Sequence, residues 1–331
     1  MRRPALHHDP VGTSLATLLI VCGLQFPVFG QGQPAPLRGT RLDVVFSASL
    51  FRTVNRNDAT AAIRVWASMF AQTHGFQLST TLDVADDVAG VRRRVLAGSV
   101  GVLGLDVVEY FQLADLAEVE PVFWALGEGN APPRWLLLVG SESGISSLEG
   151  LRAKTAIIYA KTGANLGQVW LDAMLYDGRL GRPDRFLRSV DVVAKASSAI
   201  LPVFFGKADA AVVDEPSFDV AKEMNPQLGA KLRVLTASPP LPEGILCICR
   251  NRLEFREEFV QDMQELQRDP QGRQMLMVFR FSRLAPVDIP ALMPLRQMWR
   301  KHTLLFKPTE KASAGSSSRQ ETHLSGKGEA Q

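Results

Sequence analysis

The residues best suited to binding chemistry stand at two expected strand-to-helix turns in the second half of the chain. Thr162 and Gly163 open an expected helix directly after a strand, and Ser197 opens the next helix. Backbone N–H groups at a helix N-terminus carry the positive end of the helix dipole, and the bare backbone of Gly163 permits close approach. These residues are therefore candidates to hold an oxyanion. Simple N-capping by Thr162 or Ser197 is the alternative, because hydroxyl groups there also cap helices.

A second group of candidates follows the first expected strand. Ser47, Ser49 and Phe51 come after its C-terminal end, which is the side on which open α/β sheets bind ligands. The two hydroxyl groups can hydrogen-bond a solute. The Phe51 ring can form a pocket wall or cover the edge of the core. Ligand contact and plain packing both remain open for this group.

Two further candidates are Asp214, after a strand of the second half, and Ser143, near the middle of the chain. The Asp214 carboxylate can bind a cationic group of a zwitterionic solute, or it can cap the helix that follows. The Ser143 hydroxyl can reach a cleft from a hinge, or it can stabilise a turn. We interpret both residues as candidate solute contacts.

Residues for covalent catalysis do not come together in this sequence. His7 and His8 lie near the start of the chain, His302 and His323 near its end, and His74 at an expected helix terminus that favours a cation. The segment 140–144 has Glu142 where a nucleophile elbow requires serine. No glycine-rich phosphate loop or metal-type cluster is present either. We predict a non-enzymatic protein with no cofactor and no metal.

Length and charge limit the class of protein further. A chain of 331 residues exceeds one ordinary core and predicts two lobes. The formal net charge of +3 lacks the clustered basic surface of nucleic-acid-binding proteins, so we expect no nucleic-acid partner.

The two ends of the chain differ from the rest in composition. Residues 1–30 have a basic start and an uncharged apolar run at 14–29, which is typical of a cleaved signal peptide and of a periplasmic or secreted protein. The alternative, an uncleaved anchor, is disfavoured because the run is short and contains Pro27. Residues 307–331 are rich in Ser, Gly, Lys and Glu, which predicts a disordered tail.

Between these ends, β-branched runs alternate with helical periodicity, which predicts an α/β protein with mostly parallel sheets flanked by helices. The expected strands are 42–46, 76–82, 100–105, 119–126, 135–139, 154–158, 189–193, 210–214, 232–236 and 245–250. The expected helices are 58–73 with Asp58 as N-cap, 87–97, 106–114, 163–176, 197–205, 218–224, 253–267, 271–278 and 289–305. We assign residues 41–139 and 243–306 to lobe 1 and 140–242 to lobe 2, with hinge crossings near 139–141 and 239–244.

Four ordered segments between residue 42 and about 236 resemble the phosphonate-binding periplasmic proteins of ABC importers. Ser143–Lys154 is similar to a Ser-Gly-Ile segment followed by Leu-x-Asp-Leu-Lys-Gly-Lys, and Val203–Ala211 to Val-x-x-Gly-x-x-Asp-Ala-hydrophobic. The other two segments are the strand and Asp-started helix at 44–59 and the glycine-containing strand at 95–104 with Tyr110 beyond it. The resemblance implies a two-lobed type-2 periplasmic binding fold.

The chain departs from that family at two binding positions. Relatives often have a Ser-Thr-Ser-Gly-like loop where this chain has Lys161, Thr162 and Gly163, and a histidine where it has Lys195 before Ser197. Lys161 or Lys195 would supply positive charge instead.

Together these features predict a monomeric, extracytoplasmic receptor. It would capture a small anionic solute, phosphonate-like or phosphate-like, by hinge closure between its lobes and deliver it to an ABC permease. The alternative is a secreted sensing module for a membrane signalling partner.

Overall fold

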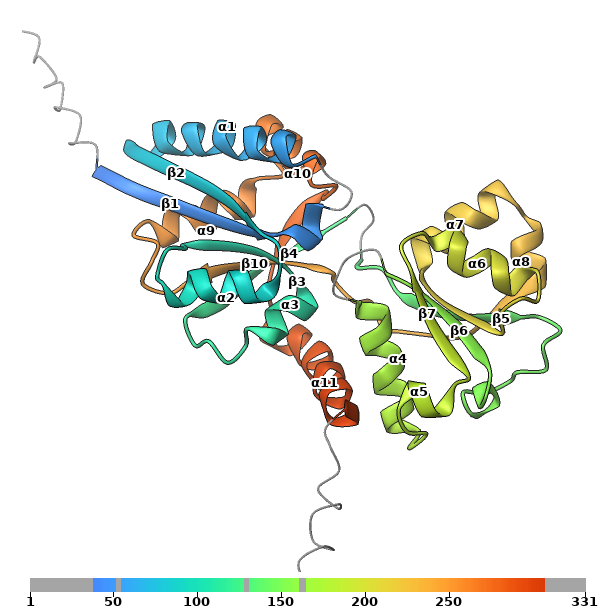
Figure 1. The fold of residues 1–331 in the computed structure, drawn as a ribbon. Coiled ribbons are helices and arrows are strands. Elements are labelled where there is room, and N and C mark those ends of the chain that lie inside the picture. Colours follow the sequence, from blue (N-terminus) through green and yellow to red (C-terminus); the bar gives the residue numbers. More distant parts are fainter. Residues whose placement is uncertain (1–37, 52–54, 128–130, 161–164, 307–331) are drawn as a thin grey trace, which may run out of the picture. The chain divides into compact units, whose positions relative to one another are not determined.

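The computed structural model describes residues 38–51, 55–127, 131–160 and 165–306 (Figure 1). The expected leader at 1–30 and the expected tail at 307–331 lie outside these ranges. Within them, the elements form two β-sheets with helices on both faces of each.

The first sheet has six strands in the order β11-β4-β10-β3-β1-β2. β1 is parallel to β2 and β3, whereas β10 is antiparallel to β3 and β4, and β11 is antiparallel to β4. The strand bounds are β1 Arg38–Ser47, β2 Phe76–Ala85, β3 Val102–Asp106, β4 Val119–Leu126, β10 Gly244–Cys249 and β11 Arg283–Pro286.

Helices cover both faces of this sheet (Figure 1). On one face, α1 (Arg56–His74), α9 (Arg256–Glu265) and α10 (Pro270–Val278) pack through Trp66, Phe259 and Leu276 onto the strands. On the other face, α2 (Val88–Leu96) and α3 (Val107–Gln112) pack through Val95 and Val108. This division follows from the alternation of side chains along each strand.

Local signals in the sequence explain where several helices begin and end. Gly75 ends α1 in the left-handed conformation at φ 67°, which glycine adopts without a steric penalty. Asp87, the first residue of the expected helix 87–97, is the N-cap of α2. The expected N-cap at Asp58 is wrong. Asn55 caps α1 instead, because its side-chain oxygen accepts hydrogen bonds from the N–H groups of Asn57 and Asp58.

The second sheet has five strands in the order β7-β6-β8-β5-β9. Its strands are β5 Trp135–Gly140, β6 Thr155–Tyr159, β7 Ser189–Val193, β8 Ala210–Asp214 and β9 Leu232–Ala237. β6 is parallel to β7 and β8, and β5 is antiparallel to β8 and β9.

The helices of this part again lie on two faces. One face carries α6 (Ala196–Phe204), α7 (Glu215–Met224) and the short α8 (Gln227–Lys231). The other face carries α4 (Leu166–Asp177) and the short α5 (Pro183–Phe186). The sequence pattern does not indicate α5, α8 or β11, because each element is too short to show a period.

The crossing from the first sheet to the second comes earlier than expected. The sequence predicts it near 139–141, but β5 pairs with β8 and β9 and so belongs wholly to the second sheet. The chain therefore crosses between Leu126 and Trp135, and it returns between Ala237 and Gly244. An apolar run such as β5 has the same appearance in either sheet, so the sequence pattern did not separate the two cases.

The last described helix, α11 (Ile289–Phe306), follows β11 of the first sheet but contacts α4 as well as α3. Leu292, Leu295 and Met298 bury its apolar side in the same core cluster as α4. In the described part of the chain, no helix combines the length and apolarity that a membrane span requires.

Candidate functional site

Strand directions bring several candidate residues to one edge of the first sheet. Ser47 ends β1 and Asp106 ends β3, and Gly244, which begins β10, pairs with Asp106. Leu126 ends β4 one residue beyond the partner of Gly244. Both crossings leave or enter at this edge, which we call the crossing edge of the first sheet.

A buried carboxylate organises the crossing edge of the first sheet. The Glu109 side chain accepts hydrogen bonds from Ser47 Oγ at 2.6 Å and Ser49 Oγ at 2.9 Å. It also accepts one from the backbone N–H of Asp106 at 3.0 Å, which completes a capping box at the start of α3. Ser47, Ser49 and Glu109 are all more than nine-tenths buried. The expected hydroxyl groups are thus at the edge, but they donate to Glu109, a residue that the sequence analysis did not propose as a contact.

The second sheet has a corresponding edge. Asp214 ends β8 and pairs with Trp135, the first residue of β5, so the C-terminal end of β8 lies where the chain arrives from the first sheet. β6 and β7 run parallel to β8, and α4 and α6 begin just beyond their C-terminal ends. Asp214 and Ser197 are therefore brought to this crossing edge of the second sheet.

The three helices that begin here differ in their caps. Asn165 caps α4 by accepting from Gln168 N at 3.0 Å, and buried Asp214 caps α7 by accepting from Ser217 N at 2.7 Å. α6 starts after Lys195, whose side chain makes no capping hydrogen bond. Ser197 is the second residue of α6 and is exposed, so it is not the N-cap. The start of α6 thus combines exposed hydroxyl groups, a lysine and N–H donors.

The remaining predicted residues are not all brought together. Ser143 follows the C-terminal end of β5, which is antiparallel to β8, and so lies at the opposite end of the second sheet from Asp214. There its exposed hydroxyl group donates to the carbonyl of Gly140 at 2.7 Å, a turn contact. Phe51 ends a short 3-10 helix, Ala48–Phe51. Lys161, Thr162 and Gly163 lie outside the described residues.

Sequence reasoning also missed Arg134, which lies in the first crossing. Its Nε donates to the carbonyl of Ser238 in the second crossing at 2.9 Å, and Ser238 Oγ accepts from Trp135 N at 2.8 Å. Two backbone hydrogen bonds, Ser238 N to Trp135 O and Leu241 N to Pro133 O, complete the link. The only signal in the sequence is a basic residue between two prolines and a strand.

The described residues offer little reactive chemistry elsewhere. Cys247 and Cys249 are buried and unbridged, and burial raises the pKa of Cys249 to about 12 and that of Cys247 well above its ordinary value. Both are therefore protonated thiols at neutral pH, which are poor nucleophiles. Within these same residues, no group of three His, Cys, Asp or Glu side chains is placed to hold a metal ion.

Comparison with known proteins identifies the family. Residues 53–291 match the model of the phosphonate ABC transporter periplasmic substrate-binding proteins. The chain belongs to this family. Its members are periplasmic binding proteins of ABC transporters, not enzymes. No curated protein sequence matches the chain significantly.

Solved structures of low sequence identity share the fold of this family member. XAC2383 from Xanthomonas citri, bound to ATP, is 14% identical with a TM-score of 0.62, over 81% of this chain and 98% of that one. PhnD1 from Prochlorococcus marinus, in complex with methylphosphonate, is 10% identical with a TM-score of 0.54, over 80% and 98%. A binding protein component of an ABC phosphonate transporter from Pseudomonas aeruginosa is 16% identical with a TM-score of 0.52, over 81% and 88%. The predicted α/β fold of type-2 periplasmic binding proteins is confirmed.

Proposed function

We propose that this periplasmic binding protein captures a small oxyanion, phosphonate-like or phosphate-like, between its two lobes for an ABC importer. The start of α6 is the observation that carries the proposal. Its N-cap residue, Lys195, makes no side-chain hydrogen bond to the first N–H groups of the helix, and Ser197 is exposed two residues later. Uncapped N–H groups, a hydroxyl group and a lysine are a complete set of donors for an oxyanion. Lys161, Thr162 and Gly163 before α4 belong to the same proposed site.

Carboxylates define the other end of the proposed site. Asp214 and Glu215 stand at the start of α7, and Asp106 and Glu109 stand at the crossing edge of the first sheet. A zwitterionic solute would place its anionic group at the α6 start and its cationic group toward Asp214. Ser47, Ser49 and Phe51 would contribute from the first lobe.

In the proposed mechanism the two lobes close by bending at the crossings 127–134 and 238–243. The hydrogen bonds between Arg134, Trp135 and Ser238 hold these two segments side by side, so they would bend together. A cleaved leader at 1–30 would export the chain, which we expect to act as a monomer without a nucleic-acid partner. The bound, closed form would then be recognised by the permease.

Isothermal titration calorimetry of the mature chain with phosphate, phosphite, methylphosphonate, 2-aminoethylphosphonate, sulfate and methanesulfonate tests this function. We expect saturable binding of one anion class and a tenfold or greater loss of affinity in Ser197→Ala. Ser143→Ala is the matched control, because it removes the hydroxyl group of another exposed serine, which lies at the opposite end of the same sheet. Absence of binding by every anion to the folded protein would contradict the proposal and favour a sensing module for another solute.

A further inference from the structure

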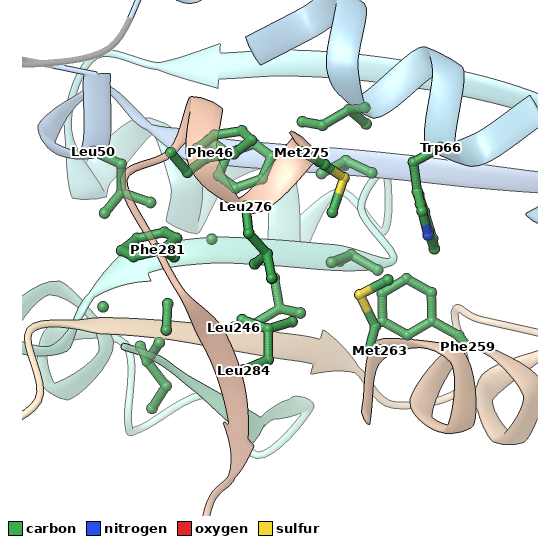
Figure 2. Close-up of a pocket in the computed structure, with 18 residues that line it drawn as sticks. Phe46, Leu50, Trp66, Leu246, Phe259, Met263, Met275, Leu276, Phe281 and Leu284 are labelled. Carbon is green, nitrogen blue, oxygen red and sulfur yellow. The ribbon is translucent and has the colours of Figure 1, made fainter. Parts of the chain in front are cut away.

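An apolar cavity of about 80 Å³ lies inside the first lobe, between one face of the first sheet and helices α1, α9 and α10. Strand residues such as Val44 and Leu246 line the cavity on the side of the sheet, and helix residues such as Trp66 and Leu276 line it on the side of the helices. Figure 2 shows Leu50 and Phe281 toward one end, and Trp66, Phe259 and Met263 toward the other. Every residue that lines it is apolar.

Neither close packing nor water accounts for this space. Protein interiors contain few voids larger than one water molecule, and a water needs two to four polar partners to occupy one. The lining of this cavity offers almost no polar surface. An apolar group is therefore the occupant that its chemistry suits, as in apolar cavities of about 150 Å³ that stay dry and bind benzene.

One end of the cavity reaches the crossing edge of the first sheet. Gly104, Ala125 and Gly244 line it from three neighbouring strands, and Gly244 pairs with both Ala125 and Asp106. Phe46 and Leu50, which are next to Ser47 and Ser49 in the chain, line the same end and are only half-buried. Partly exposed residues of the lining thus lie next to the polar candidate residues Ser47 and Ser49 in the chain.

The side chains at this end can adjust to a guest. Phe46 stacks on Phe279 with ring centroids 5.2 Å apart, and Phe279 stacks on Phe281 at 6.3 Å. Half-buried Met275 lies beside them in the lining. The flexible thioether of a methionine fills irregular space with little strain, so Met275 can adjust around a guest beside the stacked rings.

We propose that this cavity, the apolar chamber, receives a linear alkyl substituent of the captured oxyanion, an inference that rests on the proposed function. The chamber volume of about 80 Å³ is about half of the roughly 150 Å³ that holds the six carbons of benzene, so it fits a chain of about three carbons. The solute class is then a short-chain organic oxyanion. Its charged group binds at the crossing edges and its carbon chain enters the first lobe beside Phe46 and Gly104.

The experiment measures Kd by calorimetry for two series, methyl- to pentylphosphonate and methane- to pentanesulfonate. Each buried methylene group strengthens binding about fourfold, so the propyl member of the recognised series should bind about 16-fold more tightly than the methyl member. Affinity should stop rising beyond propyl or butyl, where the chamber is full.

Ala125→Leu fills the chamber from β4 and should bring the ratio of methyl to propyl Kd close to one. Ala285→Leu is the matched control, because Ala285 is also a half-buried strand alanine but does not line the chamber. It lies on the neighbouring strand β11, next to Leu284, which pairs with Ala125. It should leave the ratio at about 16. Should Ala125→Leu fail to fold, Val102→Ile adds one methylene group to the same wall and should shorten the best chain by one carbon.

The outcomes separate the two proposals. If no anion of either series binds, the proposed function fails, and the chamber proposal fails with it. If methylphosphonate or methanesulfonate binds but Kd is indifferent to chain length, or Ala125→Leu keeps the full ratio, the chamber proposal alone is overturned.

Discussion

His302 Nδ1 lies 2.7 Å from Asp172 Oδ2, and the Asp172 side chain is fully buried. The second carboxylate oxygen of Asp172 accepts from Gln168 Nε2 at 2.7 Å. Because α11 follows the first sheet and α4 belongs to the second, this contact adds a link beside the two crossings. A buried carboxylate requires such partners, since an unpaired one is costly.

We expect His302→Ala to destabilise the protein by about 2–4 kcal/mol, because it leaves the buried Asp172 carboxylate with Gln168 alone. Breaking a fully buried pair costs about 3–5 kcal/mol. The expected loss is smaller here because the His302 side chain is 23% exposed. Urea unfolding at pH 7 measures the change. Lys301→Ala is the control on the same helix, since its ion pair with Asp177 is more exposed and should contribute less than about 1 kcal/mol. Equal effects of the two variants would contradict this interpretation.

The buried Glu109 network gives a second prediction. Both oxygens of the Glu109 carboxylate accept a hydrogen bond from a serine hydroxyl group. In Glu109→Gln an NH₂ group, which can only donate, takes the place of one of these oxygens. The hydrogen bond with Ser47 or Ser49 at that position must therefore reverse its direction or be lost. We expect a loss of about 1–3 kcal/mol of unfolding free energy. Denaturant melts of Glu109→Gln and of the exposed control Glu142→Gln measure the difference. A Glu109→Gln variant as stable as the control would show that the network contributes no stability.

The buried thiols give a prediction about alkaline pH. Burial, with a smaller contribution from Glu118, raises the pKa of Cys249 to about 12, from an ordinary value of 9.0. A raised pKa in the folded state stabilises the protein fully below the ordinary pKa, and that stability is lost as the pH rises from about 9 to about 12. Cys249→Ser should therefore unfold with a weaker dependence on pH above 9 than the unmodified protein. Rapid labelling of either thiol by iodoacetamide in the folded protein at pH 8 would argue against burial.

Much of the fold could be predicted because its signals are local. Gly75 and Asp87 mark a helix end and a helix start through their own conformation and hydrogen bonding, and both were placed correctly. The position of Ser143 could not be predicted in this way, because it depends on a non-local property. The direction of β5 relative to β8 decides at which edge of the sheet Ser143 lies, and the sequence of an apolar strand does not show that direction. The contact between Ser47 and Glu109 spans 62 residues, so no spacing rule shows it.

A last prediction concerns acid pH and Asp209, which directly precedes β8. Partial burial alone would raise the pKa of Asp209, but hydrogen bonds from Thr155 N at 2.8 Å and Thr155 Oγ1 at 2.9 Å, with the charge of Lys154, lower it below its ordinary value. A lowered pKa in the folded state stabilises the protein above the ordinary value of about 4, and this stability is lost as the pH falls through the lower pKa.

Asp209→Asn removes the titrating group, so the variant should be less stable than the unmodified protein at pH 6, and the difference should shrink toward pH 3. Urea midpoints measured at half-unit steps between these values follow the change. Asp184→Asn, at an exposed ion pair with Arg182, should shift the midpoint little at any pH. A gap for Asp209→Asn that stays constant from pH 6 to pH 3 would mean that the hydrogen bonds of Thr155, and not the charge of the carboxylate, hold β6 and β8 together at this end.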